Sequence, residues 1–230
     1  LFPLLGYQKL FLFAAIPSLI GAIFIVAFIK EKKNAEKKIF PGLRFRDLDA
    51  NFRLFMIASA VFSLGAFSYS FLMIFANKYG FAETTIPLLY LIFTAVAAAV
   101  SIPFGRLSDK IGSRKKVFLL SYILWIAVCA LFMANQSAAA IIAGFILYGL
   151  HKGAFEAVQK ALVSELAPEK YRASSLGAIQ LVTGLCALPA SLAAGIMWSA
   201  FNPFVPFFIS ITLASVSGIL MVFVKEKIRQ

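Results

Sequence analysis

Residues 84–134 have the sequence TTIPLLYLIFTAVAAAVSIPF, GRLSDKIGSRKK and VFLLSYILWIAVCALFMA, two long uncharged runs on either side of a short charged loop. About 20 apolar residues carry a helix across the roughly 30 Å hydrocarbon core of a bilayer. Backbone polar groups in lipid must be satisfied within their own segment, and these runs are too long for barrel strands. We therefore predict two membrane-spanning helices that are joined by a polar loop.

The rest of the chain repeats this pattern of apolar runs and polar connections. Two uncharged runs, residues 117–151 and 173–224, are too long for one crossing, and each is interrupted by a turn sequence, at residues 135–137 (NQS) and 201–203 (FNP). We predict an all-α membrane protein with seven spans, at residues 10–29, 54–76, 84–104, 117–134, 138–166, 173–199 and 203–224.

The composition supports a membrane protein and argues against other classes. Hydrophobic residues make up 61% of the 230-residue chain and charged residues 14%, whereas soluble domains have roughly 45–50% and about 25%. The net charge of +12 suggests nucleic-acid binding, but the basic residues sit in clusters between uncharged runs, so no nucleic-acid partner is predicted. Cys129 and Cys186 lie in apolar runs and the chain has one histidine, so we predict neither a metal site nor a cofactor.

Charge also predicts the orientation in the membrane. If seven helices alternate, the basic segments fall on one side, and these are residues 30–53, 105–116, 168–172 and 225–229. The opposite side has little beyond Lys9 and Lys78. By the positive-inside rule, we expect the basic loops and the C-terminus to be cytoplasmic and the protein to lie in the plasma or inner membrane.

The spans are unevenly spaced along the chain. We predict that residues 1–29 form an outer loop and the last helix of one bundle, that residues 30–53 form a basic cytoplasmic linker, and that residues 54–230 form a six-helix bundle. The linker is either a solvated charged run or an electrostatic anchor on the lipid surface. Because the chain opens at Leu1 without the features of a signal peptide, we expect it to be part of a longer protein.

The charged loop between the third and fourth predicted spans carries a recognisable motif. The motif residues are Gly105, Asp109, Lys110, Gly112 and Arg114. The glycines permit a tight reversal, and Asp109 and Arg114 can form charge-assisted bonds with neighbouring loop ends. The loop resembles the G-x-x-x-D-[RK]-x-G-R-[RK] motif of the major facilitator superfamily, with Ser113 standing where the family often has arginine.

The resemblance extends over nearly the whole chain. Residues 160–172 resemble the end of the family's tenth helix and the loop after it, and the small-residue helix at 174–199 resembles its eleventh. Residues 10–29 then correspond to helix six, and the rest to helices seven to twelve. The resemblance implies a missing N-terminal half and a 12-helix permease whose two bundles rock around a midplane site.

The predicted span at 138–166 carries the deepest ionisable residues. Tyr148, Lys152, Glu156 and Gln159 share one helix face. We expect them to line a translocation path, with Glu156 as the candidate proton carrier if transport is proton-coupled. The alternative is a structural ion pair, because Glu156 is four residues from both Lys152 and Lys160.

Other polar side chains within the spans are also candidates for the path. His151 lies about a quarter-turn away on the same helix and is either an interhelical hydrogen-bonding group or a ligand-binding group. Gln180 is the candidate on the eleventh helix, whose other small residues are expected to serve packing. The span at 54–76 carries a polar stripe that either faces the cavity or bonds to other helices, made of Ser59, Ser63, Ser70 and Asn77.

At the basic end of the spans we predict a network of charges. Its members are Asp109, Arg114, Glu165, Glu169 and Arg172. In the family such networks hold one side closed and must break in the other state, whereas isolated exposed pairs contribute only about 0–1 kcal/mol each. The alternative is a set of solvated loop charges without a gating role.

The predicted function is secondary active transport of a small solute by alternating access. The chain shows no paired catalytic carboxylates and no nucleophile–base pair, and residues 105–112 do not match a phosphate-binding loop, so we expect no enzymatic activity. The alternatives are a receptor or scaffold that reuses the fold and, less favoured, a membrane enzyme. The expected partners are the lipid bilayer, the missing N-terminal half, a small-molecule substrate and, if transport is coupled, protons.

Overall fold

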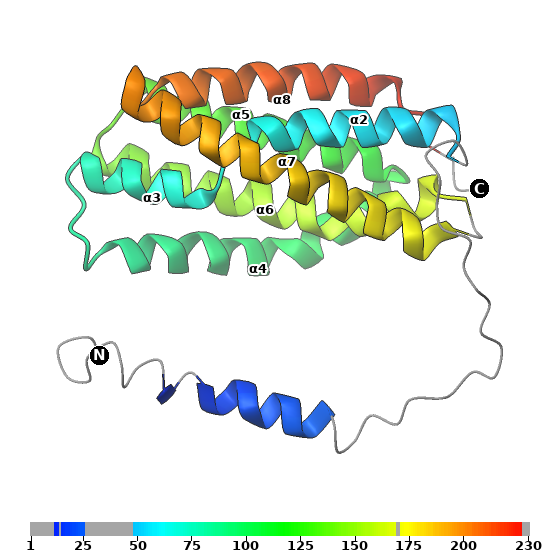
Figure 1. Ribbon diagram of the computed structural model, residues 1–230, viewed down its shortest axis with the longest axis horizontal. Coiled ribbons are helices and arrows are strands. Elements are labelled where there is room, and N and C mark those ends of the chain that lie inside the picture. The colour runs from blue at the N-terminus through cyan, green and yellow to red at the C-terminus, as the bar shows by residue number, and fades with distance from the viewer. Residues whose placement is uncertain (1–11, 14, 26–47, 169–170, 227–230) are drawn as a thin grey trace. The chain divides into compact units, whose positions relative to one another are not determined.

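The computed structural model describes residues 12–13, 15–25, 48–168 and 171–226, and Figure 1 shows their course. The chain divides into two compact units, Leu1–Gly42 and Leu43–Gln230. The first unit contains the short apolar helix Ala15–Ile25, which lies within the predicted span 10–29. The remainder of that span, and most of the predicted linker 30–53, lies outside the described residues.

The second unit is a bundle of helices that run lengthwise beside one another (Figure 1). Taken as one interrupted span, α2 and α3 are long and apolar enough to cross a membrane, and so is each of the other helices. The predicted all-α membrane fold with its six-span bundle is therefore confirmed. Of the seventh predicted span, residues 10–29, the described residues show the apolar helix Ala15–Ile25, which is shorter than a membrane crossing. The helices are α2 (Ala50–Gly65), α3 (Tyr69–Lys78), α4 (Ile86–Ile111), α5 (Arg114–Ala134), α6 (Ala138–Leu166), α7 (Arg172–Ala200) and α8 (Val205–Phe223).

Helix α6 packs against both α4 and α5, and glycines permit its close approach to α4. A Cβ atom at Gly149 would lie 2.7 Å from the carbonyl oxygen of Phe93 and 2.7 Å from Val96 Cβ. A Cβ at Gly153 would lie 2.8 Å from the carbonyl oxygen of Ala97. In lipid, where hydrophobic transfer does not drive helices together, such close van der Waals contact stabilises a helix pair.

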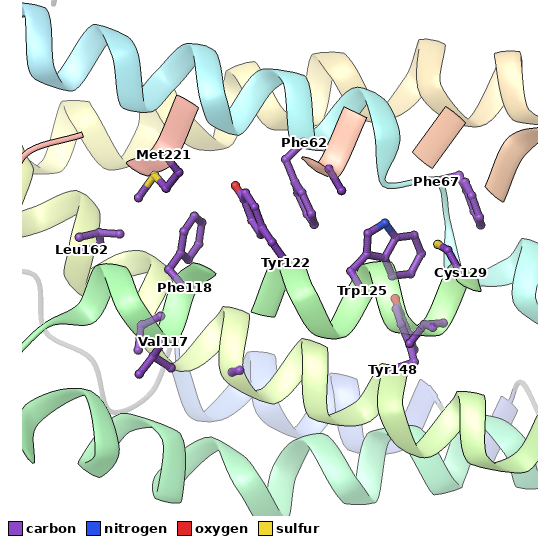
Figure 2. Packing of buried hydrophobic residues seen from close by; sticks show 14 of the residues in the cluster. Phe62, Phe67, Val117, Phe118, Tyr122, Trp125, Cys129, Tyr148, Leu162 and Met221 are labelled. Atoms are coloured by element: carbon purple, nitrogen blue, oxygen red, sulfur yellow. The ribbon is translucent and has the colours of Figure 1, made fainter. Parts of the chain in front are cut away.

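Aromatic side chains fill the interior between α2, α5, α6 and α8. Figure 2 shows Phe62 of α2 beside Tyr122 of α5, and the two rings stack at 4.0 Å between centroids with 5° between their planes. Trp125 is 1% exposed, and its indole Nε1 donates a hydrogen bond to Ser210 Oγ at 2.8 Å. This bond fixes one edge of the ring against α8 and satisfies a polar atom that would be costly to bury alone.

The predicted loop 105–116 is mostly helical, which corrects the sequence interpretation. Helix α4 continues through Gly105 and Asp109 to Ile111, and α5 starts at Arg114. Only Gly112 reverses the chain, with a φ of 67°, a left-handed conformation that glycine adopts without a Cβ penalty. Gly105 therefore has no role in the turn, because a polar segment beyond the membrane can remain helical until a C-terminal cap stops it.

The first predicted span of the bundle is not one helix, and this is the second correction. The prediction placed a continuous helix at residues 54–76, whereas α2 ends at Gly65 and α3 starts at Tyr69 with its axis offset (Figure 1). In between, the Phe67 ring is buried edge-on against Trp125 at 5.5 Å and Phe207 at 5.3 Å. Burial of this ring and capping of α3 by Ser68 account for the interruption.

The break also ends the predicted polar stripe Ser59, Ser63, Ser70 and Asn77, because its members no longer share one helix. Ser59 is buried in α2, whereas Ser70 lies at the start of α3, where Ser68 Oγ donates to Ser70 Oγ at 3.2 Å. Asn77 Nδ2 donates to the carbonyl oxygen of Phe81 at 3.1 Å, within its own end of the bundle.

Candidate functional site

A half-open cavity of about 320 Å³ is formed by helices of the bundle. Its wall comes from the α2–α3 break, α5, α6 and α7. Pockets that bind small molecules have a similar size, apolar walls and a few placed polar groups. The lining residues are Phe62, Ser63, Ala66, Phe67, Ser68, Tyr69, Trp125, Tyr148, His151, Lys152, Phe155, Gln159, Thr183 and Ala187.

The break between α2 and α3 brings main-chain groups to this cavity. The N–H of Phe67 donates to the carbonyl oxygen of Gly65 at 3.1 Å and so leaves the carbonyl of Ser63 without the helical bond that it would otherwise receive. On the other side of the break, Ser68 Oγ accepts from the N–H of Ser70 at 3.3 Å. Unwound backbone at membrane depth is tolerated where it lines a cavity, and here it does.

Lys152 and Glu156 form an ion pair along α6. Lys152 Nζ lies 2.9 Å from Glu156 Oε1, and the two side chains are 34% and 62% exposed. Lys152 lines the cavity, whereas Glu156 is not among its lining residues. Of the two predicted i,i+4 pairs, the described residues contain this one, and no ion pair joins Glu156 to Lys160 there.

His151 links α6 to α5. Its Nδ1 lies 2.7 Å from the carbonyl oxygen of Ser121, and the side chain is 4% exposed. A carbonyl oxygen can only accept, so Nδ1 carries the proton in this contact. The ring lies among aromatic neighbours, with centroids 5.4 Å from Trp125, 5.8 Å from Tyr148 and 5.8 Å from Phe155. The structure thus shows the interhelical hydrogen bond and also places the ring at the cavity wall.

The structure brings together some of the predicted path residues and not others. The cavity is lined by Ser63, Tyr148, His151, Lys152 and Gln159. Three others, Ser70, Glu156 and Gln180, are not among its lining residues.

Sequence reasoning missed the aromatic wall and Thr183. Phe62, Phe67, Trp125 and Phe155 line the cavity, but in a chain with 25 phenylalanines nothing distinguishes these rings from packing residues. Thr183 could have been found, since it stands four residues before Ala187 on the face that carries small residues. Its Oγ1 donates to the carbonyl oxygen of Ile179 at 2.8 Å.

At the α4–α5 turn, Arg114 connects two carboxylates. Its guanidinium lies 2.7 Å from Glu165 at the end of α6 and 3.5 Å from Asp109 near the end of α4. The side chains of Arg114 and Glu165 are 17% and 19% exposed, whereas Asp109 is 60% exposed. Of the other predicted members of this network, Arg172 is the first residue of α7 and Glu169 lies outside the described residues. Of the other motif residues, Lys110 is the basic residue in the last turn of α4.

Glu226, which follows α8, contacts this turn, and the sequence analysis did not predict that contact. Its carboxylate accepts from Ser113 Oγ at 2.6 Å, from the Arg114 N–H at 2.6 Å and from the Lys115 N–H at 3.1 Å. A carboxylate at a helix N-terminus pairs with the free N–H groups there. Ser113 departs from the family motif, and it caps α5 by accepting from the Lys116 N–H at 3.3 Å.

The tail is held at two further points. Lys115 Nζ donates to the carbonyl oxygen of Val224 at 2.8 Å, and Asn51 exchanges two hydrogen bonds of 2.7 Å with the backbone of Lys225. The start of α2, the start of α5 and the end of α8 are therefore joined. No sequence signal predicted this, because the partners are more than 100 residues apart.

Comparison with known proteins agrees with the fold. Residues 53–229 match the Major Facilitator Superfamily. The chain is 36% identical over 228 residues to an uncharacterized MFS-type transporter of Methanocaldococcus jannaschii, covering 95% of this chain and 56% of that protein. It is 33% identical over 119 residues to a probable metabolite transport protein of Bacillus subtilis, covering 51% of this chain and 24% of that protein. The chain thus spans about half the length of the first of these relatives.

The helical bundle, the Asp109–Arg114–Glu165 turn and the match over residues 53–229 lead to one conclusion. This chain belongs to the major facilitator superfamily.

Proposed function

We propose that the chain forms one half of a secondary transporter that moves a small solute across the membrane by alternating access. The observation that carries the proposal is the cavity lined by Lys152, Gln159 and the α2–α3 break. Polar and ionisable groups within apolar spans are costly and face water, protein or a substrate pathway. A second six-helix half supplies the opposite wall, as in transporters whose site lies between two repeats.

In this proposal the α4–α5 turn is a latch for one conformational state. Arg114 holds Glu165 and Asp109, while Glu226 holds the start of α5. Charge-assisted bonds of this type contribute about 1.5–3 kcal/mol when shielded and less when exposed. Interaction free energies of this size can stabilise the closed state, and the bonds can still break when the bundles rock. By the positive-inside rule we place this end of the bundle in the cytoplasm and the protein in the cell membrane.

Coupling to protons is proposed for the Lys152–Glu156 pair. A carboxylate 2.9 Å from an ammonium group can release that group to a substrate when it takes up a proton, so that protonation and substrate binding are linked. Glu156→Gln keeps the size of the side chain and removes the titration. We expect this variant to lose uptake driven by a pH gradient and to keep exchange of solute between the two sides.

The test is uptake into proteoliposomes that hold the full-length protein. The solutes are one radiolabelled sugar, one amino acid, one organic anion and one organic cation, each with and without a pH gradient. At least one should accumulate, and Lys152→Met should reduce its uptake at least tenfold. Lys160→Met is the matched control, since this lysine is on the same helix and outside the cavity lining, and it should retain uptake.

If no solute accumulates in vesicles containing correctly folded protein, the proposal of transport fails and a receptor or scaffold role becomes the better explanation. If Glu156→Gln still concentrates solute under a pH gradient, coupling resides elsewhere and only the coupling step is lost.

A further inference from the structure

The lining of the cavity includes a positively charged side chain and no negatively charged one. Lys152 is the one lysine or arginine among its lining residues, and none of them is an aspartate or glutamate. The counter-ion Glu156 approaches Lys152 from outside the lining. The first turn of α3 also borders the cavity, because Ser68 and Tyr69 are lining residues, and the N-terminal end of a helix carries partial positive charge. Lys152 therefore offers an ammonium group for which an anionic ligand group can compete with Glu156.

The remainder of the wall is aromatic. Ring-bearing side chains line the cavity from the α2–α3 region, α5 and α6. Figure 2 shows three of them, Phe67, Trp125 and Tyr148, in the packed interior. These rings are fixed by other contacts. The Trp125 indole is bound to Ser210 at 2.8 Å, and Phe67 is packed edge-on against it at 5.5 Å. The lining rings with more exposed surface are Tyr69, which is 39% exposed, and Phe155, which is half-buried. These two can make offset or edge-to-face contacts with a flat aromatic guest.

His151 supplies a hydrogen-bond acceptor with defined direction. Its Nδ1 is taken by the Ser121 carbonyl oxygen at 2.7 Å, so a neutral imidazole presents an unprotonated Nε2. No other described residue hydrogen-bonds to that nitrogen, and the ring belongs to the cavity wall. A ligand group that fits here must donate, as a hydroxyl or an amine N–H does.

We propose that the cavity binds an organic anion with a flat aromatic body, its carboxylate or similar group held by Lys152 and a hydrogen-bond donor on the ring held by His151. This inference rests on the proposed transport function and names its substrate class. An organic cation would gain from the rings, but no carboxylate lines the cavity to pair with it. A neutral sugar would gain from the polar groups of the wall, but it would give the Lys152 ammonium no new ionic partner.

Four small probes separate the parts of this proposal without any variant. Phenylacetate is the aromatic anion, phenylacetamide its neutral isostere, cyclohexylacetate its non-aromatic counterpart and 4-hydroxyphenylacetate the version with a donor. Binding to the full-length protein in nanodiscs is measured by calorimetry. We expect phenylacetate to bind about 10- to 100-fold more tightly than phenylacetamide and about 2- to 10-fold more tightly than cyclohexylacetate. The 4-hydroxy compound should bind about fivefold more tightly than phenylacetate.

Variants then assign each preference to a residue. Lys152→Met should remove the preference for phenylacetate over phenylacetamide, Lys152→Arg should retain it, and Lys160→Met should leave it unchanged. His151→Phe keeps a flat ring and removes the acceptor. It should abolish the gain from the 4-hydroxyl group while phenylacetate still binds. Such a selective loss would not arise from a general packing defect.

The outcomes separate this inference from the transport proposal. Lys152-dependent binding of phenylacetate without uptake into proteoliposomes supports the inference and overturns the transport function. Uptake of a sugar or of phenethylammonium without binding of the anions overturns the inference and keeps transport. Equal affinity for phenylacetate and phenylacetamide, or no binding of any anion probe, overturns the inference.

Discussion

The α4–α5 turn and the central cavity hold their charged groups in different ways. At the turn, Arg114 meets two carboxylates and Glu226 meets three donors. In the cavity, Lys152 has one ionic partner, which lies outside the lining, and the rest of the wall consists of rings, hydroxyls, an imidazole, the Gln159 amide and two alanines. Arg114 and Glu226 each have several partners and serve to hold a conformation. Lys152 has a single ionic partner and lines a cavity, so a ligand can compete for it.

The largest expected effect comes from the packing behind the cavity. Gly153 adjoins Lys152 on α6 and faces α4, and a Cβ there meets the Ala97 carbonyl oxygen at 2.8 Å. Gly153→Ala should destabilise the bundle by about 1–3 kcal/mol, because α4 must move away. Thermal unfolding in detergent measures the effect. Gly177→Ala on α7 is the control, since nothing lies within 4 Å of its Cβ, and unchanged stability of both variants would contradict the close approach of α4 and α6.

The second prediction separates the turn from the cavity. Arg114→Ala leaves the shielded carboxylate of Glu165 without its 2.7 Å partner. The closed state should therefore lose about 1–2 kcal/mol of stability, and this end of the bundle should open more often. Cysteines placed on either side of the turn would show the change as faster labelling in the full-length protein. Ligand affinity should change less than threefold. A large loss of affinity together with unchanged labelling would reverse the roles assigned to the two regions.

The smallest effect concerns the cap at the break. Ser68 caps α3 through Ser70, and Ser137 caps α6 through Ala140, in both cases with 3.3 Å bonds. Ser68→Ala and Ser137→Ala should each cost about 0.5–1 kcal/mol in unfolding measurements. Ser68 lines the cavity and Ser137 does not, so only Ser68→Ala should also weaken ligand binding. Equal binding by the two variants would mean that the N-terminus of α3 does not act on the ligand.

The sequence was most informative where the signal is local. Apolar runs predicted all six spans of the bundle, and the turn sequences at 135–137 and 201–203 fall where α5 and α7 end. The i,i+4 spacing of Lys152 and Glu156 predicted their ion pair. The motif predicted that Asp109 and Arg114 would meet other loop ends, and Arg114 does so at Glu165.

The sequence was least informative where partners are distant along the chain. Gly65 and Ser68 flank the helix break as a helix end and a cap, but only the burial of Phe67 against α5 and α8 makes an interruption favourable. Similarly, Glu226 is an ordinary charge in a basic tail until α8 places it over the start of α5.

The sequence by itself determined that this chain crosses a membrane as a set of helices and which residues of α6 are polar at depth, because hydrophobic length and helical period are local properties. Only the tertiary structure decided that Lys152 faces a ring-lined cavity while Glu156 stays outside it, that His151 is bound to Ser121, and that α2 breaks beside them. These features depend on which side chains from separate helices compete for the same space, and that competition arises only when the bundle is packed.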